Sequence, residues 1–227
     1  MTIAVQELGY TPDPEMVERI FAEARPMGQA SDRGRKNLGY GHLYYSLVRL
    51  LRPAHILAVG SGYGFSVVSL GLGLRDNGSG RLTFVDPSGV RAGLSFGSEV
   101  FGGKAGSWDT PEKVRTRFAK FGLEKIVTHY KMFDRQFFEQ YSKLNLPRIN
   151  LSLIDGNHEY SYALYDFQQT LSHLIRPGYV LLHDSNWLVE KVGLFNGVRR
   201  LIGELKKAGY PVTMFDPGGG LALVEVR

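Results

Sequence analysis

The sequence contains no cysteine among its 227 residues. Without thiols, the chain forms no disulfide, no thiolate metal site and no cysteine nucleophile. Any metal in this protein is therefore held by oxygen or imidazole ligands. An absence of cysteine also agrees with a cytoplasmic location, which we predict.

Long hydrophobic runs are also missing. The most apolar stretch, residues 56–74, is interrupted by five glycines and reads as strand, loop and helix, so we expect no membrane contact. The first ten residues include Glu7 and no basic residue, and we expect no signal peptide. The net charge of +5 comes from scattered basic residues, which favours a solvated basic surface over a nucleic-acid partner.

Strand and helix patterns alternate along most of the chain, and this alternation is typical of a parallel sheet. Asp13-Pro14 marks a helix start, and Pro53 stops a second helical pattern. We predict strands at 55–59, 81–85, 126–130, 149–154 and 179–183. Helical patterns cover 14–25, 42–51, 65–74, 111–121, 135–143, 160–174 and 198–205.

The C-terminal part has a different pattern. Two β-rich runs flank Asp216-Pro217-Gly218-Gly219-Gly220, which predicts an antiparallel hairpin at the end of the sheet. The fold class is therefore α/β: a Rossmann-like, doubly wound, mostly parallel sheet with helices on both faces. We expect a single globular domain, in which residues 1–37 form an N-terminal helix and covering segment and 38–227 form the main domain.

A glycine-rich loop, Gly60-Ser61-Gly62-Tyr63-Gly64, follows the first strand and opens a helix. Glycines at such a point let the backbone approach a ligand and expose helix N-terminal amides to it. The next strand ends in Asp86, whose carboxylate can accept hydrogen bonds from both ribose hydroxyls. Together the loop and the acid predict an adenosine-containing ligand.

Two cofactor classes share this arrangement. A nicotinamide dinucleotide fingerprint is G-x-G-x-x-G, but the third glycine position is Phe65 here. The observed G-x-G-x-G spacing suits a ligand without a pyrophosphate, such as S-adenosylmethionine. An NAD(P)-dependent oxidoreductase and a non-catalytic S-adenosylmethionine-binding protein remain as alternatives, and so does a tight turn without a ligand.

The chain resembles, in the right order, five motifs of the class I S-adenosylmethionine-dependent methyltransferases, two of which overlap. Within that class the chain is similar to the small-molecule O-methyltransferase branch that contains catechol, caffeoyl-CoA and macrolide-sugar enzymes. The resemblance implies O-methylation of a small hydroxylated molecule and is compatible with homo-oligomerisation. It is carried by "LLRPAHILAVGSGYGFSVVSL", "LTFVDPS", "NLSLIDGNHEYSYALYDF", "IRPGY" and "LIRPGYVLLHDSNW".

The chain departs from this family at Ala58, where members usually carry an acid that orders the loop and the methionine end of the cofactor. Ser61, Ser66 and Asp155 are candidates to replace that acid. The resemblance also places Met132, Phe133 and Asp134 near the adenine. The predicted cofactor-binding residues are Gly60, Ser61, Gly62, Gly64, Asp86, Met132, Phe133, Asp134 and Asp155.

Two carboxylates close neighbouring strands, Asp155 after 149–154 and Asp184 after 179–183. Strand ends of a parallel sheet meet at one edge, and paired carboxylates there suit a hard cation such as Mg²⁺. Each aspartate also reads as a simple turn or cap. In catechol-type enzymes an Asn follows the second acid, but here Ser185 follows and Asn186 comes one residue later. The predicted metal ligands are thus Asp155, Asp184 and Asn186, with Ser185 as a substitute, and a site without a metal is the alternative.

His158 lies three residues after Asp155, where the resemblance places a general base. Its near-neutral ordinary pKa suits that role, although a solvent-facing histidine is equally consistent with the pattern. We therefore predict His158 and Asp155 as catalytic residues. His183 is expected to face the core, as a structural residue or as one that supports the neighbouring site residues. Aromatic candidates for the acceptor pocket are Tyr40, Tyr44, Tyr63, Trp108 and Trp187, with segments 29–41 and 87–110 shaping it.

Overall fold

The computed structural model describes residues 13–88, 108–186 and 197–227. Trp187 and most of the 87–110 segment, both predicted to shape the acceptor pocket, lie outside these residues. Among the described helices, none combines the length and the apolar character that crossing a bilayer requires.

A seven-stranded sheet with the order β3-β2-β1-β4-β5-β7-β6 forms the centre of the molecule. Strands β1 to β5 pair in parallel, whereas β7 is antiparallel to both β5 and β6. This confirms the predicted mostly parallel sheet with a C-terminal hairpin. The strands are β1 (His55–Val59), β2 (Arg81–Val85), β3 (Val127–Tyr130), β4 (Ile149–Ile154), β5 (Leu174–His183), β6 (Val212–Phe215) and β7 (Leu221–Val226).

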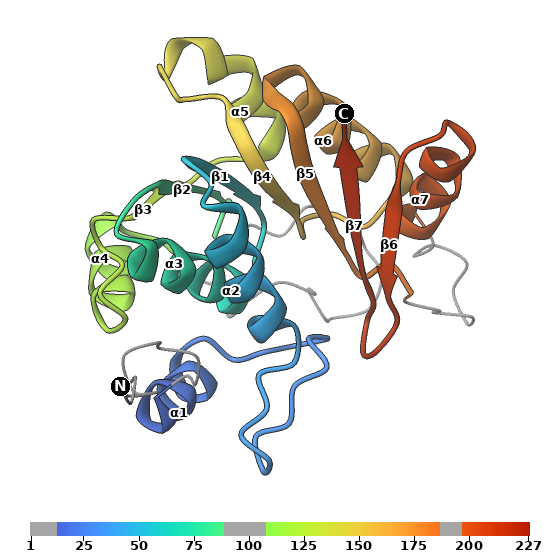
Figure 1. The fold of residues 1–227 in the computed structure, drawn as a ribbon. Helices are drawn as coiled ribbons and strands as arrows, with labels where there is room; N and C mark the ends of the chain where they lie inside the picture. Colours follow the sequence, from blue (N-terminus) through green and yellow to red (C-terminus); the bar gives the residue numbers. More distant parts are fainter. Residues whose placement is uncertain (1–12, 89–107, 187–196) are drawn as a thin grey trace, which may run out of the picture.

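Helices cover both faces of the sheet (Figure 1). One layer contains α2, α3 and α4, with α1 packed against it, and the opposite layer contains α5, α6 and α7. A short 3-10 helix at Tyr141–Lys143 continues α5. The helices are α1 (Pro14–Glu23), α2 (Tyr40–Leu51), α3 (Phe65–Asn77), α4 (Pro111–Ala119), α5 (Asp134–Gln140), α6 (Tyr160–His173) and α7 (Gly197–Lys207).

The central strand β1 shows why both faces need a helical layer. All five of its residues are buried, and successive side chains point to opposite faces of the sheet. Ile56 and Ala58 belong to the core beneath α2 and α3, whereas Leu57 and Val59 belong to the core beneath α5, α6 and α7. A strand buried on both faces reads as a continuous apolar run, which is the pattern in the sequence.

Local signals set several helix boundaries. The Asp13 side chain accepts a hydrogen bond from the Glu15 amide and Pro14 is the first residue of α1, as the sequence predicts. Thr110 caps α4 in the same way, through a bond from the Lys113 amide, with Pro111 following it.

Several boundaries differ from the prediction by a few residues, and two of these differences have a clear physical reason. Strand β5 begins at Leu174, which we expected to end the preceding helix; Leu174 pairs with Ile149 of β4, and the register shifts before Leu151. A buried leucine satisfies either element, so periodicity alone does not separate the two. Helix α2 begins at Tyr40, two residues earlier than expected, because Tyr40 and Tyr44 both face the core.

The strand order reverses between β1 and β4, which are neighbours in the sheet although distant in sequence. In open α/β sheets this switch point opens a crevice at the carboxyl ends of the strands, where ligands bind. The glycine-rich loop after β1 and Asp155 after β4 both lie at this point.

Candidate active site

The glycine loop between β1 and α3 has a backbone that only glycine adopts easily. Gly60, Gly62 and Gly64 all have positive φ angles, of 69°, 47° and 87°. A Cβ atom on Gly60 would lie 2.3 Å from the Asp155 carbonyl oxygen, so the loop packs directly on the chain that leaves β4. The Ser61 and Ser66 hydroxyls form a buried hydrogen bond of 2.7 Å across the loop.

Trp108 supports this loop from the side of α4. Its indole Nε1 donates to the Gly62 carbonyl over 3.1 Å, and its ring leaves no room for a Cβ on Gly64. The Arg117 guanidinium lies 4.7 Å from the Trp108 ring centroid and also donates to the Tyr63 carbonyl. Only 2% of Trp108 is exposed, so it packs beneath the loop, whereas we had considered it for the acceptor pocket.

Asp86 lies at the end of β2, beside the glycine loop. Its carboxylate accepts a hydrogen bond of 2.7 Å from the Ser88 amide, and its carbonyl contacts His129 Nε2 at 2.9 Å. Burial raises the pKa of this carboxyl to about 6, with a smaller contribution from the charge of Asp155. The side chain is therefore partly desolvated, and it lies at the strand end where a ribose is expected.

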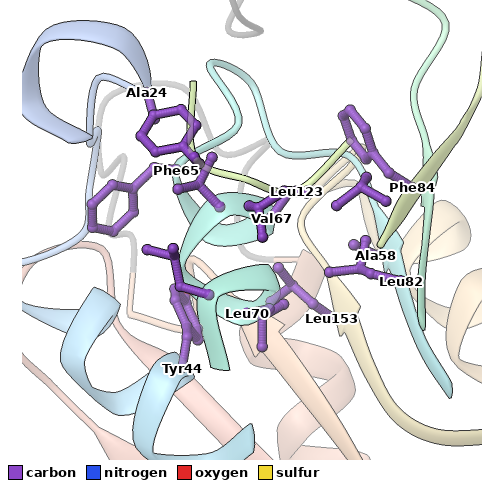
Figure 2. Close-up of a cluster of buried hydrophobic side chains, with 14 of the residues drawn as sticks. Ala24, Tyr44, Ala58, Phe65, Val67, Leu70, Leu82, Phe84, Leu123 and Leu153 are labelled. Carbon is purple, nitrogen blue, oxygen red and sulfur yellow. The ribbon is translucent and has the colours of Figure 1, made fainter. Parts of the chain in front are cut away.

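Ala58 is completely buried, and its cross-strand neighbours are Phe84 and Leu153 (Figure 2). The family acid expected at this position would therefore enter apolar surroundings. Both hydroxyls that we considered as replacements, those of Ser61 and Ser66, bond to each other in the neighbouring loop.

Met132, Phe133 and Asp134 follow β3, as expected. Phe133 is 39% exposed, which is unusual for a large apolar side chain in this molecule. Asp134 is the first residue of α5 and neighbours the buried Asp166 of α6. Burial and then the charge of Asp134 raise the pKa of Asp166 to about 9, so this carboxyl is neutral near pH 7. Sequence reasoning missed Asp166 because its helix was interpreted through its apolar positions alone.

Four ionisable side chains converge at the ends of β4 and β5: Asp155, His158, His183 and Asp184. His183 Nδ1 lies 3.1 Å from an Asp155 oxygen and 3.3 Å from an Asp184 oxygen. His158 Nε2 lies 3.4 Å from the other Asp184 oxygen and 3.7 Å from Asp155. The candidate residues Asp155, His158 and Asp184 thus come together. His183, which we expected to be structural or to support the site residues, lies between the two carboxylates.

Backbone features place three of these side chains, those of Asp155, His183 and Asp184. The Asp155 amide donates to the Val59 carbonyl, which ties it to the end of β1, and Asp184 has a positive φ of 55° that turns the chain out of β5. His183 is the last residue of β5 and is paired with Leu221 of β7. Alternation along β5 places His183 on the same face as Leu181, but the sequence carries no signal that two carboxylates meet it there.

The charges in this cluster depend on each other. Burial alone would lower the pKa of the His183 imidazole, but the carboxylates of Asp155 and Asp184 outweigh burial and raise it to about 10. Burial would likewise raise the pKa of Asp155, whereas the imidazoles of His183 and His158 hold it well below its ordinary value. The cluster therefore concentrates negative charge around one imidazole.

Asn186, a predicted metal ligand, uses its side-chain amide to donate to the Asp216 carboxylate over 2.7 Å. Its backbone amide donates to Gly219, so Asn186 belongs to the contact with the β6–β7 turn. Ser185, its predicted substitute, is completely buried, and its hydroxyl has no hydrogen-bond partner among the described residues.

The N-terminal segment closes one side of the cluster. A Cβ atom on Gly28 would lie 3.4 Å from both an Asp184 oxygen and His183 Cε1, and the Gly28 carbonyl accepts a bond from Gly219. Tyr40 donates to the Phe215 and Pro217 carbonyls of the hairpin, and its ring meets His183 edge-on at 6.3 Å. The Tyr44 hydroxyl donates to Gln29 within the same wall, over 3.0 Å.

A family model described as a methyltransferase domain matches residues 57–185, more than half of the chain. The matched part runs from β1 to the serine after Asp184 and contains the glycine loop and Asp86. It also contains Asp155, His158, His183 and Asp184, which together form the histidine–carboxylate cluster. The chain belongs to the methyltransferase-domain family. A search among curated proteins gives no match to this member of the family.

Solved structures share the fold of this methyltransferase-domain protein across nearly its whole length. The O-methyltransferase from Bacillus cereus, in complex with SAH, aligns with a TM-score of 0.66 and 15% identity, covering 98% of this chain and 96% of that chain. TomG from Streptomyces achromogenes, an O-methyltransferase involved in tomaymycin synthesis and crystallised with SAM, gives 0.62 and 16%, covering 95% and 91%. SAH-bound PaMTH1 from Podospora anserina gives 0.62 and 15%, covering 100% and 98%.

Proposed function

We propose that this methyltransferase-domain protein transfers a methyl group from S-adenosylmethionine to a hydroxyl of a small molecule. One observation carries the proposal: Gly60 of the cofactor loop packs on the backbone of Asp155, which belongs to the histidine–carboxylate cluster. The glycine loop and the histidine–carboxylate cluster are thus in direct contact at the switch point of the sheet.

The cofactor would lie along the strand ends on the β2 side of this contact. Asp86 would accept hydrogen bonds from the ribose, and the loop of Gly60, Ser61, Gly62 and Gly64 would line the methionine end. Asp155 would add a carboxylate near the cofactor ammonium in place of the missing acid at Ala58. Met132, Phe133 and Asp134 would border the adenine, and the exposed Phe133 ring offers an apolar face for it.

Methyl transfer itself needs an in-line approach and one proton acceptor. The acceptor oxygen forms a bond to the methyl carbon while the bond between that carbon and the sulfonium sulfur breaks, and sulfur keeps the electron pair. His158 Nε2, beside the Asp155 and Asp184 carboxylates, would take the hydroxyl proton. Holding both reactants at strand ends supplies much of the rate by proximity and orientation.

Two alternatives from the sequence stand beside methyl transfer. Membership of the methyltransferase-domain family favours methyl transfer over an NAD(P)-dependent oxidoreductase. A cofactor-binding protein without turnover is separated from an enzyme by the experiment below. A cytoplasmic location, a lack of nucleic-acid and membrane partners, and homo-oligomerisation stay predictions.

Two substitutions test whether Asp86 serves cofactor binding and Asp155 serves turnover. We expect Asp86→Ala to weaken S-adenosylmethionine binding by about 10- to 100-fold, because the ribose loses a charged acceptor. We expect Asp155→Ala to reduce turnover at least ~100-fold with a smaller change in cofactor affinity. Calorimetry with S-adenosylmethionine and NAD, and a methyl-transfer assay on catechol, sugar and polyketide acceptors, give the two readouts.

Three outcomes would contradict the proposal. Binding of NAD in place of S-adenosylmethionine would indicate the oxidoreductase. Tight cofactor binding without turnover on any acceptor would indicate a binding protein. Full activity in Asp155→Ala would remove the histidine–carboxylate cluster from the reaction.

The donor set does not fit the Mg²⁺ site that the sequence suggested. Mg²⁺ prefers oxygen ligands, whereas the Asp155–Asp184 pair encloses a histidine nitrogen, and Asn186 bonds to Asp216. The proposed transfer therefore uses no step that passes through Mg²⁺.

A further inference from the structure

Asp166, in the middle of α6, is a buried carboxyl to which the proposed mechanism gives no role. The residue is completely buried, and among the described residues neither of its oxygens receives a hydrogen bond from an N–H group or a hydroxyl. Burying an ionised carboxylate without a donor is costly, so this position favours the neutral acid. A neutral carboxylic acid has a proton to donate.

A second carboxyl lies next to Asp166. The Asp134 side chain, from the first residue of α5, is within hydrogen-bonding reach of Asp166 and is partly exposed. Two ionised carboxyl groups offer only acceptors, so a contact between them needs a proton that both share. Burial and then the charge of Asp134 raise the pKa of Asp166 to about 9, which assigns that proton to the buried member.

Arg135, the next residue of α5, connects the two helices. Its guanidinium lies 5.6 Å from the ring centroid of Tyr162 and 5.0 Å from that of Tyr165, both in α6. Within the described part of the chain, the charged and titratable groups that act on Asp166 are Asp134 and Arg135 from α5 and Tyr165 from α6. Arg135 therefore holds the start of α5 against α6 and keeps the two carboxyls together.

The carboxyl pair lies at the ligand-binding edge of the sheet. A Cβ atom on Gly156, in the turn after β4, would lie 3.9 Å from Asp166 Oδ2. Asp134 begins the helix that follows β3, so both members of the pair lie near the carboxyl ends of parallel strands. Asp166 is packed behind the turn after β4, and the partly exposed Asp134 is the member that a ligand can reach.

We propose that Asp166 is a positioning residue for adenine: its proton bonds to one oxygen of Asp134 and directs the other oxygen to the 6-amino group of the base. The inference rests on the proposed function, in which Asp134 borders the adenine. The 6-amino group is a donor, and an ionised carboxylate is a charged acceptor for it. Holding Asp134 in one rotamer before binding reduces the entropy that is lost when the cofactor binds. A 6-oxo purine presents an acceptor at the same place, so the carboxylate repels it.

The adenine selectivity of the full chain tests this role without any methyl acceptor. Calorimetry at pH 7 compares S-adenosylhomocysteine with S-inosylhomocysteine, in which a carbonyl replaces the 6-amino group. We expect the wild type to bind the adenine compound about 10- to 100-fold more tightly. Asp166→Leu should lower this ratio at least about fivefold, whereas Asp166→Asn, whose amide donates to Asp134 as the acid does, should keep it within about twofold.

A pH series removes the shared proton without any substitution. Above about pH 9 the wild type loses this proton, and two like charges then repel each other. The affinity of the wild type for S-adenosylhomocysteine, divided by that of Asp166→Asn at the same pH, should fall at least about threefold between pH 8 and 10. Titration of the ligand itself cancels in this quotient. A role for Asp166 in packing alone would leave the quotient flat.

Thr170→Val is the matched control. Thr170 lies one turn further along α6, is completely buried, and its hydroxyl has no hydrogen-bond partner among the described residues. Its substitution should leave the selectivity unchanged. Equal binding of the two compounds by the wild type would overturn the inference. So would full selectivity in Asp166→Leu, an equal loss in Thr170→Val, or a flat pH quotient, which decides the matter even when the leucine variant does not fold.

Failure of this inference and failure of the proposed function give different results. Adenine selectivity without methyl transfer to any acceptor would contradict the proposed function alone. Binding of both compounds without selectivity would contradict the role of Asp166 alone. A chain that binds neither compound would contradict both.

Discussion

At the scale of single residues, burial gives Asp86 an acidity that is unusual for an aspartate. Its pKa of about 6 lies above the ordinary value mainly because the strand end and the glycine loop exclude water from it. The Asp86 carboxyl therefore changes from its neutral to its charged form near pH 6. Only the ionised form accepts hydrogen bonds through both oxygens, and these bonds hold a ribose.

Cofactor affinity should consequently depend on pH through Asp86. We expect S-adenosylmethionine binding to be strongest above pH 6 and to fall by up to about tenfold per pH unit below it, because binding must first remove the proton. Calorimetry between pH 5 and 8 measures this. In Asp86→Asn, which does not titrate, affinity should be lower and flat over that range. A slope that persists in the variant would assign it to another group.

At the scale of elements, the β6–β7 hairpin is held over the histidine–carboxylate cluster by helix α2. Tyr40, the first residue of α2, donates its hydroxyl to the Phe215 and Pro217 carbonyls. Burial, and then the charges of Asp216 and Asp184, raise the pKa of Tyr40 to about 12, so the hydroxyl keeps its proton at ordinary pH. The hairpin turn thereby stays in contact with the Asp184 carboxylate.

Removing this hydroxyl should loosen the hairpin. We expect Tyr40→Phe to lower the free energy of unfolding by about 1–2 kcal/mol, because the two hairpin carbonyls lose the hydroxyl proton that they share, and to speed amide hydrogen exchange in β6. Tyr45→Phe is the matched control on the same helix: its hydroxyl bonds to Asp76 at the surface, and we expect a change below about 0.5 kcal/mol. Equal losses in chemical denaturation would show that the hairpin contact contributes nothing specific.

At the scale of the whole molecule, Arg117 joins three parts that are distant in sequence. From α4 its guanidinium donates to the Glu23 carbonyl at the end of α1 and to the Tyr63 carbonyl of the glycine loop. It also lies over Trp108, and burial lowers its pKa. The N-terminal helix is thereby attached to the cofactor loop by one cation.

Losing that cation should affect stability and cofactor binding together. We expect Arg117→Met to lower the free energy of unfolding by about 2 kcal/mol and to weaken S-adenosylmethionine binding, because two partly buried carbonyls lose a charged donor. Arg115→Met, an exposed position on the same helix, should change neither by a measurable amount. Thermal unfolding and calorimetry on both variants check this, and an unchanged cofactor affinity in Arg117→Met would refute the link.

The sequence by itself determined the alternation of strands and helices, the glycine loop and the positions of Asp86, Asp155 and Asp184. These features depend on local patterns: apolar runs, capping residues and glycine spacing act within a few residues of the chain. The start of β5 at Leu174 could not be predicted, because a buried leucine fits a helix and a strand equally well.

Only the tertiary structure decided how the histidine–carboxylate cluster is composed. His183 lies between two carboxylates because β5 pairs with β7 and Asp184 turns the chain with a positive φ. Asn186 does not join the cluster and donates a hydrogen bond to the Asp216 carboxylate. The Gly219 amide donates a hydrogen bond to the Gly28 carbonyl, although almost the whole chain separates these two residues in sequence. Contacts over that separation depend on how the layers pack, and no local pattern records them.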